Sequence, residues 1–334
     1  MNLRLGNPLE AIRQLSYVSS LATSAGYLSI SLGANLRRST LLRKDGLVQE
    51  AQQIVAESAT LLIPGYMDDV IFYNWEAALI ERSSERHESA ARGLDLVVAA
   101  AERVDYRTYL ALATPISAET WVKLGRSDAA ERTLHSLEHV LDGRTRCQQS
   151  SVLCNVVTVG IQIMNDSGRQ ISFAGRSLYA NGLLALEYER ECPMVNIQGT
   201  TLLALAHISH ANGHFKEARD WLEKSKALPW SIATVRLEQL EMGAALARAE
   251  GNISEASRTY GTMMIEAQKL STTFSREYLC KSVLGLAEMN QIQGRTDDKV
   301  DSEIKKCLQA RDSGISVPLF RQFERRSRAL MLFP

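Results

Sequence analysis

The chain has 334 residues, of which 38 are basic and 38 acidic, and 45% of its residues are hydrophobic. A net charge of zero gives no electrostatic reason to expect direct contact with nucleic acid, while the hydrophobic content is enough for a buried core. No apolar run reaches the length of about eighteen residues that predicts a membrane span, and residues 1–6 lack the apolar core of a signal peptide. The five cysteines are odd in number and form no CxxC pair, which predicts reduced thiols in a cytoplasmic protein.

A glycine followed five residues later by an alanine recurs along the chain at a step of about forty residues. Gly168 and Gly294 fall in the same phase without the alanine, and Glu85 stands where the series requires a glycine. Repetition at this period is the sequence signature of a solenoid, in which each repeat contacts only its neighbours. The complete pairs are Gly6/Ala11, Gly46/Ala51, Gly125/Ala130, Gly213/Ala218 and Gly251/Ala256.

At the start of the chain the series places Gly6 in a turn, so that the first helix of the first repeat is absent or reduced to residues 1–5. The helix that we predict over residues 8–20 then either caps the array or belongs to a chain cut from a longer one. The sequence leaves both alternatives open.

The best strand candidate is the β-branched stretch over residues 152–163. Because this stretch occupies the first-helix position of the repeat that contains Gly168, we predict a buried helix there. In the same repeat, Ile161 stands where the other repeats have a small residue, and Ser177 stands where they have an apolar one. We therefore expect this repeat to be distorted.

The repeat around Gly213 shows what one unit contains. Residues 200–210 place Leu202, Leu205 and Ile208 on one broad apolar face, which is typical of a buried helix. Gly213 can take the left-handed conformation that ends a helix, residues 214–228 begin a second helix, and Pro229 stops it. The unit is therefore predicted to be a helical hairpin.

Two further spacings follow the same phase. A small residue stands seven positions before most turns, where it lets two helix axes approach closely. An apolar residue stands nine positions after most turns, where it can fill the groove of a neighbouring helix. The small residues are Ser39, Ala78, Ala118, Ala206, Ala244 and Ala287. The apolar residues are Leu15, Val55, Leu94, Leu134, Leu222 and Tyr260.

Together these marks resemble the tetratricopeptide repeat, in which a small residue, a turn glycine, an alanine and an aliphatic or aromatic residue follow one another. Here they stand as Ala206, Gly213, Ala218, Leu222 and Pro229, and as Ala244, Gly251, Ala256 and Tyr260. The family unit is about 34 residues long, and HEAT or armadillo repeats are the structural alternative at the longer period. Units of about forty residues resemble the tetratricopeptide-like arrays of large bacterial signal-transduction ATPases and of transcription activators of the maltose-regulator type.

The resemblance implies an all-α fold, an α-solenoid of about eight helix-turn-helix repeats wound as a right-handed superhelix over residues 1–317. Residues 318–334 depart from the repeat and combine an apolar side with several arginines. We predict a capping helix there, and the alternative is a basic amphipathic helix that docks on a partner or an anionic membrane.

In tetratricopeptide arrays the first helices of successive hairpins line the inside of the superhelix. We carry the groove-facing positions of the family over to this chain by their distance from each turn. These positions hold residues of both charges together with amides. Such a mixed lining suits an extended peptide, which has both backbone groups and charged termini to pair. The predicted ligand- or peptide-binding residues are Arg43, Arg82, Gln162, Asn165, His207, His210, Glu238, Glu241, Arg248, Glu288 and Gln291.

The spacing of His207, His210 and His214 is the most metal-like in the chain. Gly213 interrupts the helix between them, however, and no HExxH arrangement is present. We therefore interpret these histidines as polar residues of the groove and predict no metal and no cofactor.

The sequence thus predicts a protein- or peptide-binding scaffold with a regulatory role. The alternative is a small-molecule effector-binding sensor domain of a larger bacterial transcription regulator, which a closed, partly apolar pocket near residues 207–248 would favour. No GxSxG motif or activated nucleophile is evident, so we predict that the chain is not an enzyme. An enzyme with a site inside the solenoid is the third hypothesis.

Overall fold

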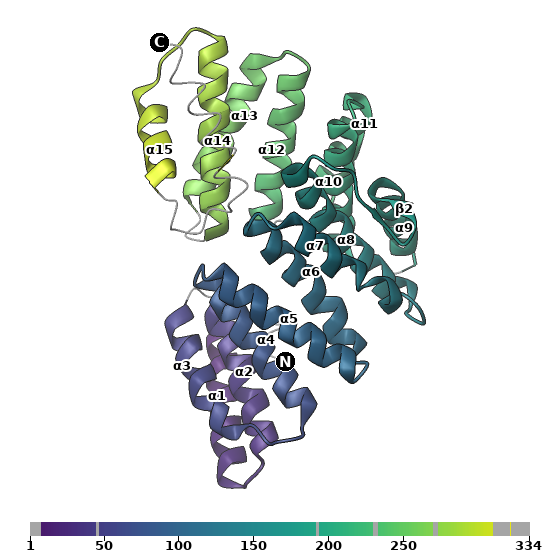
Figure 1. Cartoon of the computed structure of the whole chain (residues 1–334). Coiled ribbons are helices and arrows are strands. Elements are labelled where there is room, and N and C mark those ends of the chain that lie inside the picture. The colour runs from purple at the N-terminus through teal and green to yellow at the C-terminus, as the bar shows by residue number, and fades with distance from the viewer. Residues whose placement is uncertain are drawn as a thin grey trace. The chain divides into compact units, whose positions relative to one another are not determined.

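The computed structural model describes residues 8–44, 47–191, 194–229, 233–269 and 273–309, together with residue 321. In these residues fifteen α-helices make up nearly all of the regular structure, accompanied by two short 3-10 helices and two strands of two residues each (Figure 1). The prediction of an all-α helical-repeat solenoid is confirmed.

The chain divides into two compact units, Met1–Trp121 and Val122–Pro334, which we call unit 1 and unit 2. Unit 1 contains α1 (Pro8–Ser24), α2 (Leu28–Lys44), α3 (Val48–Ser58), a 3-10 helix (Ala59–Leu61), α4 (Met67–Ser83), α5 (His87–Arg103) and most of α6 (Arg107–Lys123). Unit 2 contains α7 (Ser127–His135), a 3-10 helix (Glu138–Val140), α8 (Arg146–Ser167), β1 (Ser172–Phe173), β2 (Arg176–Ser177), α9 (Leu178–Glu189), α10 (Val195–Ala211), α11 (Phe215–Lys226), α12 (Ala233–Ala249), α13 (Ile253–Gln268), α14 (Thr273–Ile292) and α15 (Asp298–Gln309).

The helices alternate as the repeat predicts. We call the helix before each predicted turn a first helix (α2, α4, α6, α8, α10, α12 and α14) and the helix after it a second helix (α3, α5, α7, α9, α11, α13 and α15). First helices pack on their neighbours, α2 on α4, α8 on α10, α10 on α12 and α12 on α14. The turn predicted at Gly46 lies outside the described residues, whereas those at positions 85, 125, 213, 251 and 294 each join two helices.

Left-handed backbone closes these turns. Gly213 and Gly251 both have a φ of 78°, which glycine adopts without a steric penalty. Glu85, which stands in the glycine position of its repeat, has a φ of 65°. The turn geometry is therefore maintained in this repeat although its residue is a poor one for the conformation.

The small positions pack as expected. The phased alanines after the turns are fully enclosed in five repeats, and the small residues before the turns are buried as well. Two helices thus approach closely at each hairpin, because no larger side chain stands between them. The fully enclosed alanines are Ala51, Ala90, Ala130, Ala218 and Ala256.

The repeat around Gly168 is distorted by an insertion. Residues 152–163 lie inside the helix α8, as predicted, and Gly168 ends that helix with a φ of 70°. A small antiparallel hairpin of β1 and β2 follows before α9 begins, with Phe173 opposite Arg176. Phe173 stands in the alanine position of the repeat and is almost fully buried. The insertion moves α9 out of phase, which explains why the spacing rules fail here.

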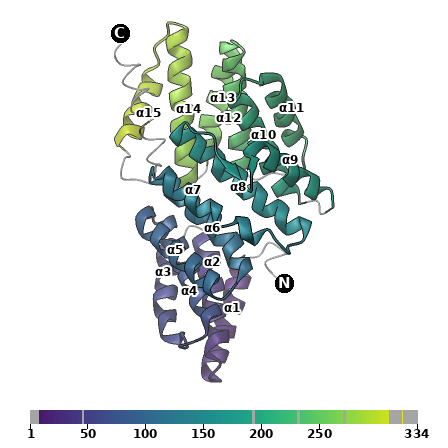
Figure 2. The same ribbon diagram turned by 45° about the vertical axis from the view of Figure 1, so that its right-hand side comes forward.

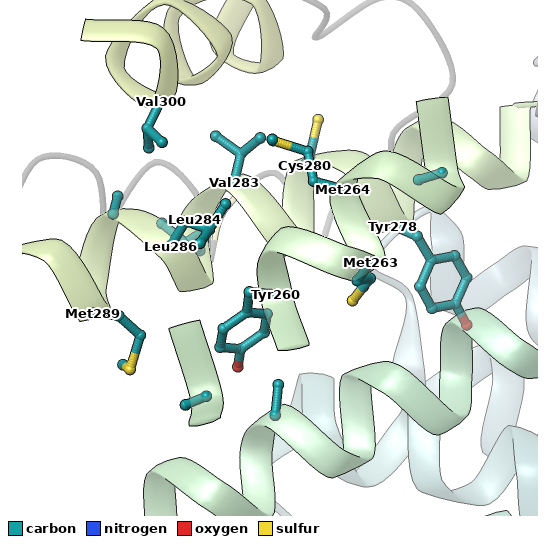
Figure 3. Close-up of a cluster of buried hydrophobic side chains, with 14 of the residues drawn as sticks. Tyr260, Met263, Met264, Tyr278, Cys280, Val283, Leu284, Leu286, Met289 and Val300 are labelled. Atoms are coloured by element: carbon teal, nitrogen blue, oxygen red, sulfur yellow. The ribbon is translucent and has the colours of Figure 1, made fainter. Parts of the chain in front are cut away.

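A large apolar cluster joins α12, α13, α14 and α15, and Figure 3 shows side chains of the last three gathered in it. Val300 and Ile304 of α15 are buried against this cluster. At the contact of α13 with α14, a Cβ added to Gly285 would lie 2.5 Å from the ring of Tyr260. The ring therefore packs directly on the α14 backbone.

The cysteine prediction is wrong for Cys147, Cys280 and Cys307, which are disulfide-bonded. Cys280 of α14 and Cys307 of α15 form a disulfide with their Cα atoms 5.8 Å apart. Counting cysteines could not reveal this, because only the antiparallel hairpin brings two residues 27 positions apart together. Cys154 is free and buried, and burial raises the pKa of its thiol to about 11. The disulfide removes the cysteine argument for a cytoplasmic location.

The predicted capping helix over residues 318–334 falls outside the described residues except for Arg321, so it stays a prediction. In the described part of the chain, no helix combines the length and the hydropathy that crossing a bilayer requires.

Candidate functional site

All eleven predicted contact residues lie on first helices. Arg43 is on α2 and Arg82 on α4 in unit 1, and the remaining nine are on α8, α10, α12 and α14 in unit 2. Within the described residues, Gln162, Asn165 and Gln291 form no hydrogen bond to another predicted residue. The structure therefore brings together a subset of the prediction, chiefly on α10, α12 and α14.

Three contacts tie α12 to α14. Arg248 Nη1 lies 2.5 Å from Glu288 Oε2. Lys281 Nζ donates to Glu241 Oε2 at 2.9 Å, and the Tyr278 hydroxyl donates to Glu238 Oε1 at 3.2 Å. In each contact the two residues are forty positions apart, because consecutive first helices pack in the register of the repeat. We call these three pairs the α12–α14 ladder.

Carboxylates outnumber cations around this ladder. Burial disfavours the charged form of Lys281, yet Glu241, Glu277 and Glu238 raise the pKa of its ammonium group above the ordinary value. Burial and the same carboxylates raise the pKa of Tyr278 well above its usual range. The Lys281 ammonium group therefore stays charged, and the carboxylates around it make the electrostatic potential of the site negative.

The two histidines of α10 stay neutral at neutral pH. Burial lowers the pKa of His207 most strongly, Glu241 opposes the change, and the cation of Lys281 reinforces it. Burial also lowers the pKa of His210, and Arg248 adds to this effect. Each ring can therefore act as a neutral hydrogen-bonding group beside the α12–α14 ladder.

Tyr278 and Lys281 are not among the predicted contact residues. A signal for both was present, because each stands forty positions after a predicted residue, Glu238 and Glu241 respectively. Carrying each groove position forward by one full repeat would have found them.

Unit 1 pairs its first helices differently. Glu76 of α4 is completely enclosed, and its Oε1 accepts from Thr40 at 2.6 Å and from Arg43 Nη2 at 3.2 Å, both on α2. Arg82 Nη2 lies 2.7 Å from Glu119 Oε2 on α6. Both predicted arginines of unit 1 are thus partners of a carboxylate on the next first helix.

An aromatic cluster accompanies these pairs in unit 1. The ring of Tyr109 lies 6.4 Å from Phe72, 6.2 Å from Trp75 and 5.0 Å from Tyr106, measured between ring centroids. Burial, followed by neighbours that include Glu76, raises the pKa of Tyr109 to about 12. All four rings are half-buried, so the cluster keeps an exposed edge.

Two cavities in the described residues lie away from the ladder. Two cavities of about 400 and 480 Å³ share Leu186, Arg190, Trp221 and Lys224, and both lie between α9 and α11. Neither contains a residue of the α12–α14 ladder. Among all the residues that the structure describes, no group of three or more His, Cys, Asp or Glu side chains could hold a metal ion.

Comparison with known proteins bears on the fold. No protein-family model and no curated protein matches the sequence. The structure is similar to the crystal structure of a signal transduction ATPase with numerous domains, with a tetratricopeptide repeat sensor, from Pyrococcus horikoshii. The TM-score is 0.57 at 14% sequence identity, over 98% of this chain and 47% of that one, so this chain spans about half the length of that protein.

A second solved structure, the tetratricopeptide repeat domain of P58(IPK), aligns over 95% of this chain and 98% of its own, at 12% identity. Its TM-score of 0.26 carries no argument. The phased hairpins and the first of these two structures lead to one conclusion: this chain has the fold of the tetratricopeptide-like helical-repeat proteins.

Proposed function

We propose that the chain is a protein-interaction scaffold with a regulatory role, which binds an extended peptide segment on its first helices. The observation that carries the proposal is the excess of carboxylates at the α12–α14 ladder. Glu238, Glu241, Glu277 and Glu288 stand there against the cations of Lys281 and Arg248. A negative surface of this kind attracts a segment with basic side chains.

The ladder suits an extended ligand because its members repeat along the array. Each first helix contributes a polar row, and an extended chain can contact several rows in succession. Glu241 and Glu288 are partly exposed, which leaves their carboxylates able to accept from a second donor. His207 and His210, when neutral, can bond to backbone amides of the ligand.

The remaining predicted residues extend this proposal to neighbouring first helices. We include Arg43, Arg82, Gln162, Asn165 and Gln291 as candidate contacts. We also propose that the chain is not an enzyme and uses no cofactor, since binding rather than bond-making explains a face of mutually paired side chains.

The test is selection of binding peptides from a random library displayed against the intact chain. We expect an enrichment of Lys and Arg and an affinity that falls as salt rises. The double variant Glu241→Gln with Glu288→Gln should weaken the selected peptide by about tenfold or more.

The matched control is Glu266→Gln, on the second helix α13, whose carboxylate pairs with Lys269. This variant should bind as the parent does. Selection of acidic or purely apolar peptides, or equal binding by the double variant and the parent, contradicts the proposal. Circular dichroism confirms that each variant is folded.

One observation favours a second candidate, a small-molecule sensor domain of a larger bacterial transcription regulator. The cavity of about 480 Å³ between α9 and α11 falls within the size range of small-molecule sites. The similar protein from Pyrococcus horikoshii is described as carrying a tetratricopeptide repeat sensor, and this chain aligns with about half of it. Binding of a small molecule with no peptide selected would favour this candidate.

A further inference from the structure

A groove opens between the second helices α9 and α11, over the N-terminal half of α10. Figure 2 shows the three helices that carry it. The lining residues come from all three helices and lie in the described part of unit 2. We call it the α9–α11 groove. Its lining residues are Leu183, Leu186, Glu187, Glu189, Arg190, Gln198, Leu202, Trp221, Lys224, Ala227 and Leu228.

Two second helices of equal length flank the groove, since α9 and α11 have 12 residues each. Both pack against α10. Ser225 Oγ donates to the Gly199 carbonyl at 3.4 Å, which fixes the end of α11 beside the N-terminal half of α10.

The other end of α9 is held closely on α10. A Cβ added to Gly182 would lie 2.8 Å from Leu205 Cδ2, so no side chain separates the two helices there. One helical turn further, Leu186 lines the groove instead of a closed contact. The groove thus begins where the close contact of α9 with α10 ends.

The floor of the groove is apolar and partly exposed. Leu202 is buried, whereas Leu186, Trp221 and Leu228 are half-buried. Leu183 keeps 40% of its surface exposed. Apolar side chains that remain in contact with water beside an indole ring offer burial to an apolar ligand.

Cations without ion-pair partners stand at the edge. Lys224 Nζ lies 4.2 Å from the centroid of the Trp221 ring, and Arg190 is exposed. Neither has an ion-pair partner among the described residues. Of the two carboxylates, Glu189 is buried and bonded to the Ser150 hydroxyl at 2.6 Å and to a backbone amide at 2.9 Å. The exposed edge therefore has two cations and one carboxylate, that of Glu187.

We propose that the α9–α11 groove binds a small amphipathic anion, an aromatic or aliphatic carboxylate or sulfonate of drug-like size. The apolar body lies against Trp221 and the leucines, and the anionic group contacts Arg190 and Lys224. Gln198 adds an amide donor at the same edge. The site is separate from the α12–α14 ladder. The inference rests on the second candidate function and deepens it by naming the chemical class of the small molecule.

The test uses two probes with the same fused-ring body. 8-Anilinonaphthalene-1-sulfonate carries a sulfonate, and N-phenyl-1-naphthylamine is its neutral counterpart. Fluorescence titration of the intact chain should show one saturable site for the sulfonate, with roughly tenfold weaker binding of the neutral probe.

Variants assign the site. Arg190→Gln with Lys224→Gln should weaken the sulfonate by about tenfold and leave the neutral probe unchanged. Leu183→Asp adds a negative charge at an exposed groove position and should weaken the sulfonate as well. Lys226→Gln is the matched control, because Lys226 is an exposed cation of the same helix that pairs with Glu223.

Equal binding of the two probes would overturn the proposal. It would show that Arg190 and Lys224 interact only with the carbonyl groups at the helix ends, which attract positive charge. Unchanged sulfonate affinity in both groove variants, or equal loss in Lys226→Gln, would overturn it too. Melting curves for each variant show whether a loss of binding comes from unfolding. Peptide selection on the α12–α14 ladder is scored separately, so either proposal can fail alone.

Discussion

The first helices of unit 1 and unit 2 carry the same ion pair at the same repeat position. Arg82 and Arg248 stand three residues before their turns, and each pairs with a glutamate six residues before the next turn, Glu119 and Glu288. The comparison shows that repeat phase decides which side chains meet. It does not decide how exposed they are: the Arg82 side chain is 23% exposed and the Arg248 side chain 40%.

The units differ in what surrounds these pairs. Unit 1 adds the fully enclosed Glu76, bonded to Thr40 and Arg43, and a half-buried aromatic cluster. Unit 2 adds the partly exposed ladder of α12 and α14 and two histidines held neutral by burial. We infer that the enclosed Glu76 and its partners in unit 1 chiefly stabilise the fold, while the ladder of unit 2 is the principal binding site.

The largest difference between the units is expected from removing one arginine in each. Arg43→Met leaves Glu76 buried without its cation and should lower the free energy of unfolding by about 3–5 kcal/mol. Arg248→Met removes a partly exposed partner and should lower it by less than about 1 kcal/mol. Urea denaturation compares the two.

Adding Glu76→Gln to Arg43→Met removes the unpaired charge and keeps an amide that Thr40 can bond. Most of the lost stability should return. Equal losses for the two arginine variants would remove the distinction between a buried and an accessible face.

Packing at the phased alanines is the next effect in size, and it should be shared by both units. Ala218→Trp and Ala256→Trp place a large side chain where two helices touch, at fully enclosed positions. Overpacking should lower the free energy of unfolding by roughly 1–3 kcal/mol or more. Ala249→Trp, at an exposed position, is the control and should melt as the parent does. If Ala218→Trp and Ala256→Trp also melt as the parent does, close packing at these alanines is contradicted.

The turns offer a smaller and opposite comparison. Glu85→Gly in unit 1 removes the backbone strain of a non-glycine residue in the left-handed conformation. It should raise the free energy of unfolding by about 0.5–1 kcal/mol. Gly251→Ala in unit 2 introduces the same strain and should lower stability by about 1 kcal/mol. Differential scanning calorimetry measures both, and a loss of stability in Glu85→Gly would mean that the Glu85 side chain matters more than its backbone.

The smallest expected effect is a pH dependence from unit 2. The folded-state pKa of His207 lies below the ordinary value of 6.5, so the unfolded chain binds more protons than the folded one as pH falls below 6.5. Stability is therefore fully present above that pH and is lost as pH falls toward the folded pKa. His207→Gln should show a smaller drop in melting temperature between about pH 7.5 and pH 5.5 than the parent. An identical drop would contradict a buried neutral imidazole.

The repeat could be predicted because its determinants are local. A left-handed turn residue and an enclosed alanine constrain the backbone within a few positions, so Gly213 and Ala218 mark a hairpin without knowledge of its neighbours. The turn at Glu85 was predicted from the repeat phase alone, although glutamate disfavours the left-handed conformation that the turn requires. The β-hairpin at residues 172–177 escaped prediction, because the failed spacing marks its repeat as distorted without indicating which structure is inserted.

The site could be predicted only in part. The sequence placed Glu241 and Arg248 on a first helix, yet the identity of their partners depends on the register of α14 against α12. The α9–α11 groove was not predicted at all, because its lining comes from three separate segments of the chain and from no motif. The disulfide of Cys280 and Cys307 likewise requires the pairing of two helices.

Hydrogen–deuterium exchange of the intact chain, with and without a library-selected basic peptide, tests the central claim most directly. We predict slower exchange on peptide binding in α12, α14 and the C-terminal half of α10, where His207 and His210 lie. Slower exchange confined to unit 1, or to the second helices α9 and α11, would contradict binding at the first helices of unit 2.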